Sequence, residues 1–495
     1  MSISILQLHD LYHRIVSLER VKITMRNLAN VKEYWFLCLV LFIYTFLIFV
    51  VISRHEPWAD EAQAWLLARD SGFVELLFKN LRYDGHPGLW YLILMLPSKL
   101  LPYRAISFLS GIIAIVGILI FLCDSPFPKI IRILFPFSYF LFYQYGVIAR
   151  SYVLLPLLLF LIASIYHAKT EKIYTFTVLL CLLAYTSVFS SLIALSLMLI
   201  HLIDLIKTKT HLNREVIAKQ VKAYAAFAIM IALIAIQLWP PEDASFAKGY
   251  RFGVGRFLNL SFSVLNEAMT ELSYISAAVL IISLIWFWQR KVLLLYLIPT
   301  LAILALFSIK YYNSWHQGII FLVWAFVMWI SFAVRESDSD ESVAHGLTRK
   351  LATASLLCVL GFHVFWSAKA SVSDLLGHYS AGQAVASYIK YNHLEDKKIY
   401  ATTFWSTSIL PYFDRNIFDN HNQGAKPAFW FWATDNRRLQ NLEQMLKDKP
   451  DLIIIGRPKQ PLAELAGYKH VGTFEGNIYW KNRIKEMNHF ALYRR

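Results

Sequence analysis

The apolar stretch WFLCLVLFIYTFLIFVVIS, residues 35–53, runs directly into the polar stretch RHEPWADEAQAW, residues 54–65. A helix needs roughly 20 apolar residues to cross about 30 Å of hydrocarbon, so the first stretch is long enough to span a membrane. The adjacent carboxylates Asp60 and Glu61 follow it closely. Because ionisable groups are costly near lipid, acids at this position favour a functional site at the membrane surface.

The composition of the whole chain agrees with a protein that crosses the membrane several times. Of 495 residues, 57% are hydrophobic and 16% are charged, and the mean hydropathy is +0.47. These values exclude an ordinary soluble domain. The net charge of +15 comes largely from Lys and Arg in short loops, where they act as topology signals, so nucleic acid is not a predicted partner. The four cysteines lie in apolar stretches without CxxC spacing and are predicted to be core residues.

Apolar stretches of suitable length recur along the chain and predict about eleven membrane spans. A basic segment, residues 1–34, precedes the first span and is predicted to be cytoplasmic, and the span itself is too long for a cleavable signal. The segment 89–101 is short and contains Pro97, so it is predicted to be juxtamembrane or re-entrant. The predicted spans are residues 35–53, 105–123, 130–149, 151–167, 173–186, 188–206, 222–239, 273–289, 292–309, 319–334 and 351–368.

This choice for residues 89–101 sends the basic loops between the spans to the cytoplasm, as the positive-inside tendency requires. Counting the segment as a full span would reverse every one of those loops. On this topology the loop 54–104, the corner at Arg150, the loop 240–272 and the loop that begins at Lys310 share the outer face with the C-terminal region. The polar residues of interest are therefore expected on one side.

From about Ser371 the apolar spans give way to alternating helix-like and strand-like segments, which indicate a small α/β domain over residues 369–495. No Gly-rich phosphate loop or metal-ligand spacing occurs in it, so a lid, an acceptor platform or a partner surface is expected. The fold class is thus an α-helical polytopic membrane protein, residues 35–368, with an α/β domain outside the cytoplasm. Predicted helices are 383–391 and 436–448, and predicted strands are 398–404, 451–456, 469–481 and 489–495.

Residues 60–70 read as a short helix with Asp60 near its N-terminus, where a carboxylate is favoured by the helix dipole. Glu61, Trp65 and Arg69 recur every four residues and are expected on one face of that helix. In the functional interpretation, one of the two carboxylates acts as a general base at the boundary of membrane and water. The alternative is a helix cap with a surface ion pair.

Several further polar residues are predicted to lie on the outer side. Asp84 and His86 precede Pro87, which favours an extended or turn conformation, and His86 could bind a phosphate, a metal ion or nothing. Arg150 lies at a tight corner between two spans, where it either extends to water or binds phosphate oxygens in a bidentate manner. Lys310 and His316 lie in an aromatic-rich loop that an interfacial belt explains only in part.

Taken together, Asp60-Glu61, DGHPGLWY at 84–91, ARSY at 149–152 and YTSVF at 185–189 resemble the GT-C membrane glycosyltransferases. The resemblance is to the branch related to protein mannosyltransferases and lipid A aminoarabinose transferases. It covers residues 35–335 by order and topology. It implies a GT-C fold in the bacterial cytoplasmic (inner) membrane. It also implies transfer of a sugar from a polyprenyl phosphate in the outer leaflet to a glycan, lipid or protein acceptor outside the cytoplasm, with the C-terminal domain in the periplasm.

The resemblance maps the catalytic carboxylate to Asp60, with Glu61 as its acidic neighbour. The donor phosphate would be bound by Arg150, His86, Lys310 and His316, and the substrates would also contact Asp84, Trp65, Arg69 and Tyr152. The chain departs from the family at Gly88, where a second proline is common, and at Ser187, where a histidine is common. It has no Asp-x-Asp beside Arg150, and no metal site or cofactor is indicated, although a divalent cation stays open.

Displacement at an anomeric carbon with a phosphate leaving group needs a base and cationic donors, but no second acid. It inverts the anomeric centre. The main alternative is a transporter or flippase of lipid-linked saccharides, which should place charges near the membrane midplane and often contains repeats or broken helices. A non-catalytic cell-envelope assembly protein is a third class. The grouping of candidate residues at one face favours the enzyme.

Overall fold

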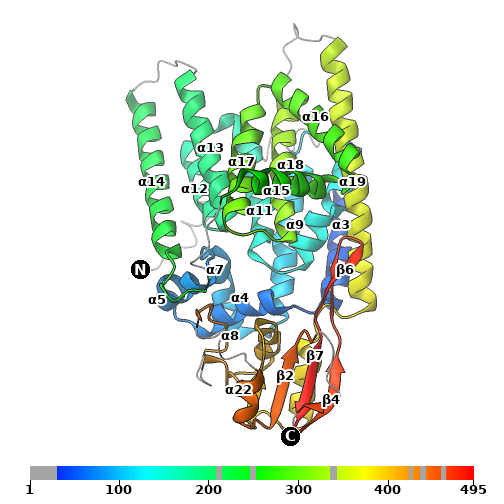
Figure 1. Ribbon diagram of the computed structural model, residues 1–495. Helices are drawn as coiled ribbons and strands as arrows, with labels where there is room; N and C mark the ends of the chain where they lie inside the picture. Colours follow the sequence, from blue (N-terminus) through cyan, green and yellow to red (C-terminus); the bar gives the residue numbers. More distant parts are fainter. Residues whose placement is uncertain are drawn as a thin grey trace.

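The computed structural model describes residues 31–207, 214–245, 252–334, 343–422, 427–434, 442–458, 464–465 and 467–495. A bundle of mostly apolar helices forms the larger part, and a smaller region with short strands lies at one end of it (Figure 1). The N-terminal segment 1–30 and the residues Lys248 and Arg251 of the 240–272 loop lie outside the described residues.

Long apolar helices make up the bundle and confirm a polytopic membrane protein. Eight of the described helical segments are long and apolar enough to cross a membrane, or nine if one bent pair counts as a single span. The core of the bundle is α18, Gln317–Ala333, almost all of whose side chains are buried by neighbouring helices. The remaining helices are α3 Val31–Arg54, α9 Ala105–Asp124, α10 Lys129–Leu134, η2 Phe135–Phe137, η3 Phe140–Val147, η4 Ser151–Val153, α11 Leu154–Ile165, η5 Tyr166–Ala168, α12 Ile173–Ala184, α13 Val188–Lys207, α14 Arg214–Leu238, α15 Val254–Met269, α16 Ser273–Gln289, α17 Leu293–Ile309, η6 Ser314–His316 and α19 Val343–Leu376.

The structure contains helices at all eleven predicted spans, but three of them differ from a simple span. α12 has 12 residues, which at 1.5 Å per residue reach only about 18 Å. α17 has 17 residues and carries Pro299 within it. α16 forms the bent pair with α15, at 89° across a short break. Eight or nine of the described helical segments thus have the length and composition of a span, and α12 and α17 are shorter apolar helices.

The expectation of a loop over residues 240–272 is wrong for residues 254–269, where the structure has a helix. α15 occupies Val254–Met269, and it lies across the bundle instead of along it (Figure 1). Its buried side chains, Val264, Ala268 and Met269, face the core while Arg256 is exposed. Arg256 is therefore an exposed residue of a helix and not part of a loop.

The segment between the first two long helices leaves and returns at the same end of the bundle. It holds α4 Ala59–Asp70, α5 Phe73–Glu75, η1 Leu76–Asn80, α6 Leu81–Asp84, α7 Leu89–Met95 and α8 Pro97–Leu100. Arg104 Nη1 donates to the carbonyl of Ser53 at 3.0 Å, which ties the two ends of the segment together. The apolar stretch Leu89–Leu100 thus does not carry the chain across the bundle. This agrees with the prediction of a juxtamembrane or re-entrant segment.

Basic residues gather at the opposite end of the bundle and bind the loops there. Lys129 Nζ lies 2.8 Å and Arg132 Nη1 2.6 Å from the carboxylate of Glu33, at the start of α3. Lys169 pairs with Asp204 at 3.1 Å. These contacts place the loops before α10, before α12 and after α13 at the end away from the C-terminal region. This agrees with the prediction that the basic loops share one side of the membrane.

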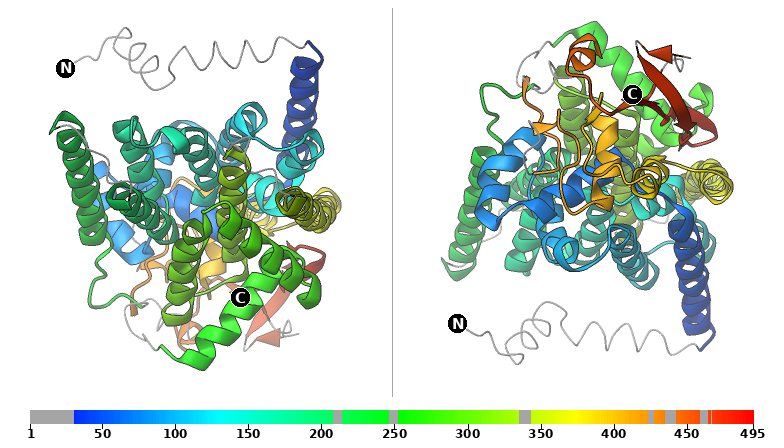
Figure 2. Two further views of the ribbon diagram at one scale, coloured as in Figure 1. Left: turned by 90° about the horizontal axis from the view of Figure 1, so that it is seen from above. Right: turned by 90° about the horizontal axis from the view of Figure 1, so that it is seen from below.

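The C-terminal region packs beside α4 and the end of α19, and Figure 2 shows it covering part of that end of the bundle. Its five-stranded sheet has the order β1-β2-β7-β4-β3, with β1 and β2 parallel and the other neighbours antiparallel. β5 and β6 form a separate antiparallel hairpin. The elements are α20 Gly382–Tyr391, β1 Ile399–Ala401, η7 Phe404–Tyr412, α22 Leu442–Lys447, β2 Leu452–Gly456, β3 Glu464–Leu465, β4 Tyr468–Phe474, β5 Asn477–Trp480, β6 Arg483–Met487 and β7 Phe490–Arg494.

The predicted mixture of helices and strands is confirmed for this region, with shifted boundaries. The helix predicted at 383–391 and the strands predicted at 451–456 and 489–495 are present. The strand predicted at 398–404 ends at Ala401 because a 3-10 helix follows, and the strand predicted at 469–481 is divided into β4 and β5. Part of the helix predicted at 436–448 lies outside the described residues, and its end is α22.

Candidate functional site

Asp60 lies in the first turn of α4 and forms an ion pair with Arg150. The helix begins after Trp58, which is its N-cap residue in extended conformation. Arg150 Nη1 contacts Asp60 Oδ2, and the two side chains keep 17% and 22% of their surface exposed, respectively. A carboxylate and a guanidinium separated by 90 positions in the sequence thus meet at a place that solvent and a ligand can reach.

The corner that carries Arg150 is short and irregular. Arg150 has extended backbone between the π-helical segment η3 and the 3-10 helix η4. Its guanidinium carbon lies 5.7 Å from the ring centre of Tyr152. Burial lowers the pKa of Arg150, and the phenols of Tyr152 and Tyr311 oppose that shift, so the group stays a cation at neutral pH.

Glu61 differs from Asp60 in being fully buried and surrounded by donors. Its Oε1 accepts from the backbone N–H of Ala149 at 2.7 Å, and its Oε2 accepts from the N–H of Trp58 at 3.0 Å. His55 Nε2 lies 3.2 Å from the same Oε2. Glu61 therefore caps α4 and ties it to the corner that carries Arg150.

A buried histidine links Glu61 to the last long helix of the bundle. His55 Nδ1 lies 2.9 Å from Asp374 Oδ2 on α19, and both groups are almost fully buried. Burial alone would lower the pKa of His55, but the carboxylates of Asp374 and Glu61 raise it to about 10. The imidazole is therefore a cation at neutral pH and bridges two carboxylates.

Asp84 and His86 lie beside each other at the turn before α7. The carboxylate of Asp84 lies 3.0 Å from His86 Nδ1, accepts from the hydroxyl of Tyr91, and has Gln63 Nε2 at 3.4 Å. Burial alone would lower the pKa of His86, but the hydrogen bond and charge of Asp84 raise it. His86 keeps 29% of its side-chain surface exposed and is available to a ligand as a donor.

His316 lies in an aromatic cage at the start of α18. The rings of Phe189 and Tyr311 lie 4.7 Å and 5.3 Å from it, and Tyr152 lies 6.0 Å away. Its Nδ1 accepts from the N–H of Asn313 at 3.1 Å, which leaves Nε2 to carry the proton of the neutral ring. The ring of Tyr152 also lies 5.7 Å from the guanidinium carbon of Arg150, so Tyr152 links two of the predicted residues, Arg150 and His316.

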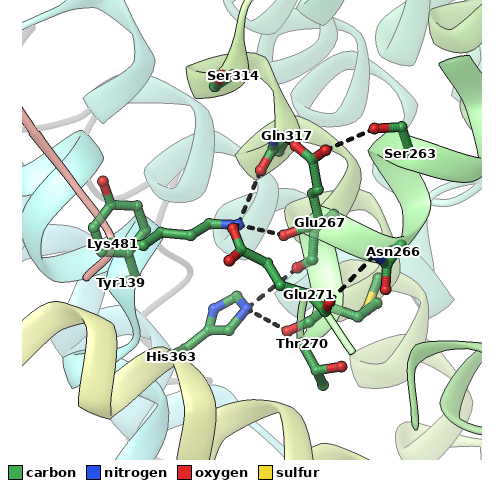
Figure 3. Close-up of polar contacts among 12 residues, drawn as sticks. Tyr139, Ser263, Asn266, Glu267, Thr270, Glu271, Ser314, Gln317, His363 and Lys481 are labelled. Atoms are coloured by element: carbon green, nitrogen blue, oxygen red, sulfur yellow. Dashed lines mark hydrogen bonds and ion pairs between the residues drawn. The ribbon is translucent and has the colours of Figure 1, made fainter. Parts of the chain in front are cut away.

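The β5–β6 hairpin packs against the bundle, and the side chain of Lys481 reaches from it to α15 and α18 (Figure 3). Lys481, at its turn, donates to the carbonyl of Glu267 at 2.6 Å, to Glu271 Oε1 at 2.8 Å and to Gln317 Oε1 at 3.1 Å. Lys485 donates to Ser314 Oγ at 2.6 Å. The hairpin thus holds the residues on both sides of His316.

Three other predicted site residues, Trp65, Arg69 and Lys310, contact other parts of the protein. Trp65 is buried, with its ring 5.9 Å from that of Tyr103. Arg69 pairs with its neighbour Asp70 and donates to the carbonyl of Phe413 at 2.8 Å, which joins α4 to the C-terminal region. Lys310 is half-buried at the end of α17, where it interacts with another group of the protein.

Sequence reasoning missed His55, Asp374, Lys481 and Lys485. His55 follows the first span closely enough to have been considered with Asp60, but the lysines had no signal because their partners are distant in the sequence. Within the described ranges, no group of three or more His, Cys, Asp or Glu side chains is placed to hold a metal ion.

Comparison with family models, curated proteins and solved structures finds no match for this chain. The chemistry of the site is therefore interpreted from its own geometry and charge. The arrangement offers a partly exposed carboxylate, a partly exposed guanidinium and a partly exposed imidazole at one end of a bundle of membrane helices.

Proposed function

We propose that the chain is a membrane glycosyltransferase that moves a sugar from a polyprenyl phosphate to a glycan, lipid or protein acceptor. The observation that carries the proposal is the Asp60–Arg150 pair, which is reachable from solvent at the end of the bundle shared with the C-terminal region. The resemblance of the four short motifs to GT-C enzymes supports the same reaction. Transfer by direct displacement needs one base and cationic donors for phosphate, and both are present here.

In the proposed reaction, the acceptor hydroxyl loses its proton to Asp60 while its oxygen forms a bond to the anomeric carbon. The bond from that carbon to the phosphate oxygen breaks, and the electron pair stays on the phosphate. Arg150 and His86 stabilise the charge that develops there, with the Nε2–H of His316 as a further donor. The anomeric centre is inverted because the hydroxyl attacks opposite the leaving phosphate.

The ion pair suits both partners before the substrate arrives. Arg150 pairs with the carboxylate of Asp60 and orients it at the corner between η3 and η4. A guanidinium has five N–H donors, so it can bind phosphate oxygens with the donors that Asp60 does not use. The phosphate of the donor lipid would thus bind next to the base.

We place the site at the outer leaflet of the bacterial inner membrane, with the N-terminus in the cytoplasm. The support is the concentration of basic side chains at the opposite end, which the positive-inside tendency assigns to the cytoplasm. The apolar helices agree with a lipid bilayer as the surroundings of the bundle. A lipid-linked donor would then reach Arg150 from the membrane side.

The experiment compares wild type with Asp60→Asn in lipid nanodiscs supplied with polyprenyl phosphates that carry different sugars and with an envelope extract as acceptor. Mass spectrometry follows released polyprenyl phosphate and glycosylated product. We expect Asp60→Asn to lower the rate by about 100-fold or more, because the base is lost. The matched control, Glu75→Gln, changes an exposed acid of the same segment and should transfer at the wild-type rate. Transfer by Asp60→Asn at that rate would contradict the assignment of the base.

One observation favours the rival class, a transporter of lipid-linked saccharides. The bent pair α15 and α16, together with the buried Lys481 beside α15, resembles the broken helices and internal charges of transporters. The two classes differ in the product. A transporter moves intact donor lipid between leaflets of a proteoliposome in the Asp60→Asn variant as well, whereas the enzyme cleaves the donor and needs Asp60.

A further inference from the structure

An aromatic cavity lies beside α4, between the C-terminal region and the start of the 240–272 segment. It has a volume of about 460 Å³, within the range of small-molecule sites, about 300–1,000 Å³. Four aromatic side chains line it, Phe404, Trp405, Trp430 and Trp432. None of the predicted site residues is among those that line it, so it is a separate feature.

Backbone hydrogen bonds hold the walls of the cavity in place. The N–H of Ser245 donates to the carbonyl of Trp432 at 2.7 Å, and Ala244 pairs with Ala433 in an antiparallel bridge. Gln63 of α4 binds both backbone groups of Trp430, its Nε2 donating to the carbonyl and its Oε1 accepting from the N–H, each at 2.8 Å. The cavity is therefore built on the same helix that carries Asp60.

The four lining rings pack against one another and against neighbouring side chains. Phe404 lies 4.8 Å from Trp432, centre to centre, and 6.3 Å from Trp430. Trp405 stacks on Trp58 with the centres 5.1 Å apart, and the guanidinium of Arg457 lies 4.0 Å from its ring centre. These contacts fix the aromatic surfaces before any ligand binds.

The polar groups of the cavity are neutral. Ser245 and Thr403 line it, and their hydroxyl oxygens are buried without a hydrogen-bond partner. The three indole N–H groups are further donors. None of the described lining residues is charged.

We propose that this cavity binds a saccharide unit of the acceptor. A sugar ring combines apolar C–H faces, which pack on aromatic rings, with hydroxyls that exchange hydrogen bonds with Ser, Thr and indole groups. The described lining residues carry no counter-charge for a charged ligand, and the nearby guanidinium of Arg457 is paired with Glu486 at 2.8 Å. The proposal rests on the proposed transfer reaction and narrows its acceptor to one that carries sugar.

The position of the cavity relative to Asp60 separates the acceptor from the donor. The sugar of the donor is bonded to the phosphate and must lie directly beside Arg150 and Asp60. Trp58, the N-cap residue of α4, stacks on the lining residue Trp405, so the cavity adjoins the start of the helix that carries Asp60. It therefore suits a saccharide unit next to the reacting one on the acceptor.

The experiment measures saturation transfer by NMR from the full chain in nanodiscs to methyl glycosides of glucose, galactose, mannose and N-acetylglucosamine. We expect saturation transfer to the ring C–H protons of at least one glycoside. The saturation-transfer signal should fall by about fivefold or more in Trp432→Ala and in Phe404→Ala. Trp432→Phe, which keeps an aromatic ring, should retain most of the signal. Trp288→Ala, at a tryptophan that is 74% exposed on α16, is the matched control and should retain all of it.

Asp60→Asn separates this proposal from the proposed reaction. It should abolish the transfer of sugar to the acceptor and leave the binding of glycosides unchanged. Absence of a signal for every glycoside in wild type would overturn the saccharide site. The same follows from equal signals in wild type, Trp432→Ala and Phe404→Ala. Displacement of the bound glycoside by sugar-free polyprenyl phosphate would identify the cavity as a lipid site and overturn the assignment to the acceptor.

Discussion

At the scale of single residues, Asp60 and Glu61 show how neighbouring carboxylates take different roles. They are adjacent in α4, yet Asp60 is partly exposed with one cationic partner and Glu61 is buried with three donors. A base must release and accept protons, which the exposed group can do more readily. Glu61 is fixed by its contacts to Ala149 and His55, so it holds the geometry in which Asp60 and Arg150 meet.

Exchange of Glu61 for Gln should therefore lower stability more than exchange of Asp60 for Asn. In Glu61→Gln one side-chain amide hydrogen faces a backbone or imidazole donor. The cation of His55 also loses a charged partner, and breaking a buried ion pair in this way costs about 3–5 kcal/mol of stability. Thermal unfolding of each variant in detergent, followed by tryptophan fluorescence, measures the difference. Equal shifts of Tm in the two variants would contradict the structural role of Glu61.

For Asp60, Arg150, His86 and His316, the sequence predicted only a shared face. Charge parity placed the four residues on one side without giving distances. The partners of Glu61 were beyond sequence reasoning, because one is the backbone N–H of Ala149 and position along the chain does not reveal it. The aromatic cage that keeps His316 neutral likewise depends on helix packing.

At the scale of elements, the β5–β6 hairpin packs against the bundle from the C-terminal region. Lys481 is fully buried there, with its Nζ 4.3 Å from the ring centre of Trp366. Burial lowers its pKa to about 8, although the carboxylate of Glu271 acts in the opposite direction. An unfolded lysine has a pKa of about 10.4, so the native hairpin disfavours the charged form.

Stability should consequently rise with pH in the range where the native lysine is neutral and the unfolded one is still charged. Between about pH 8 and pH 10 the unfolded state binds more protons, and the free energy of unfolding increases. We expect the Tm of wild type, relative to that of Lys481→Met, to increase from pH 7 to pH 9.5. Thermal unfolding across that range measures it.

The control is Lys397→Met, which removes an exposed lysine from the same region. Its Tm should follow that of wild type at each pH. Parallel curves for wild type and Lys481→Met would mean that Lys481 does not titrate in this range, contrary to its burial.

Helices and strands were predictable where a single pattern of apolar residues dominated the sequence. Continuous apolar stretches marked all eleven helices, although α12 is too short to be a span by itself. α15 was missed because polar residues interrupt it, yet Phe257, Leu260 and Val264 recur at three- and four-residue spacing, which is typical of an amphipathic helix. The β3 and β6 strands were missed because their pairing partners, and not their own residues, determine them.

At the scale of the whole molecule, the chain has two distinct ends. One is held by ion pairs among basic loops, and the other by contacts of the 54–104 segment with the C-terminal region. If the proposed orientation is correct, the second end faces the outside of the cytoplasm.

Cysteine labelling tests that orientation in intact cells. In a variant with the four native cysteines replaced by alanine, Tyr391→Cys, at an 86% exposed position, should react with a membrane-impermeant maleimide added outside. Glu171→Cys, at an exposed position of the opposite end, should react only after the membrane is permeabilised. The reverse pattern would show that the proposed site faces the cytoplasm.

The β5–β6 hairpin has a consequence for the order in which the protein matures. Asp60 leaves the ribosome early, whereas Lys481 and Lys485, which hold the loop around His316, are synthesised much later. Until the hairpin has been translocated and docked, that wall of the site has no support. We therefore expect a newly made chain to be inert toward lipid-linked sugar during its own insertion, and to become active only on completion.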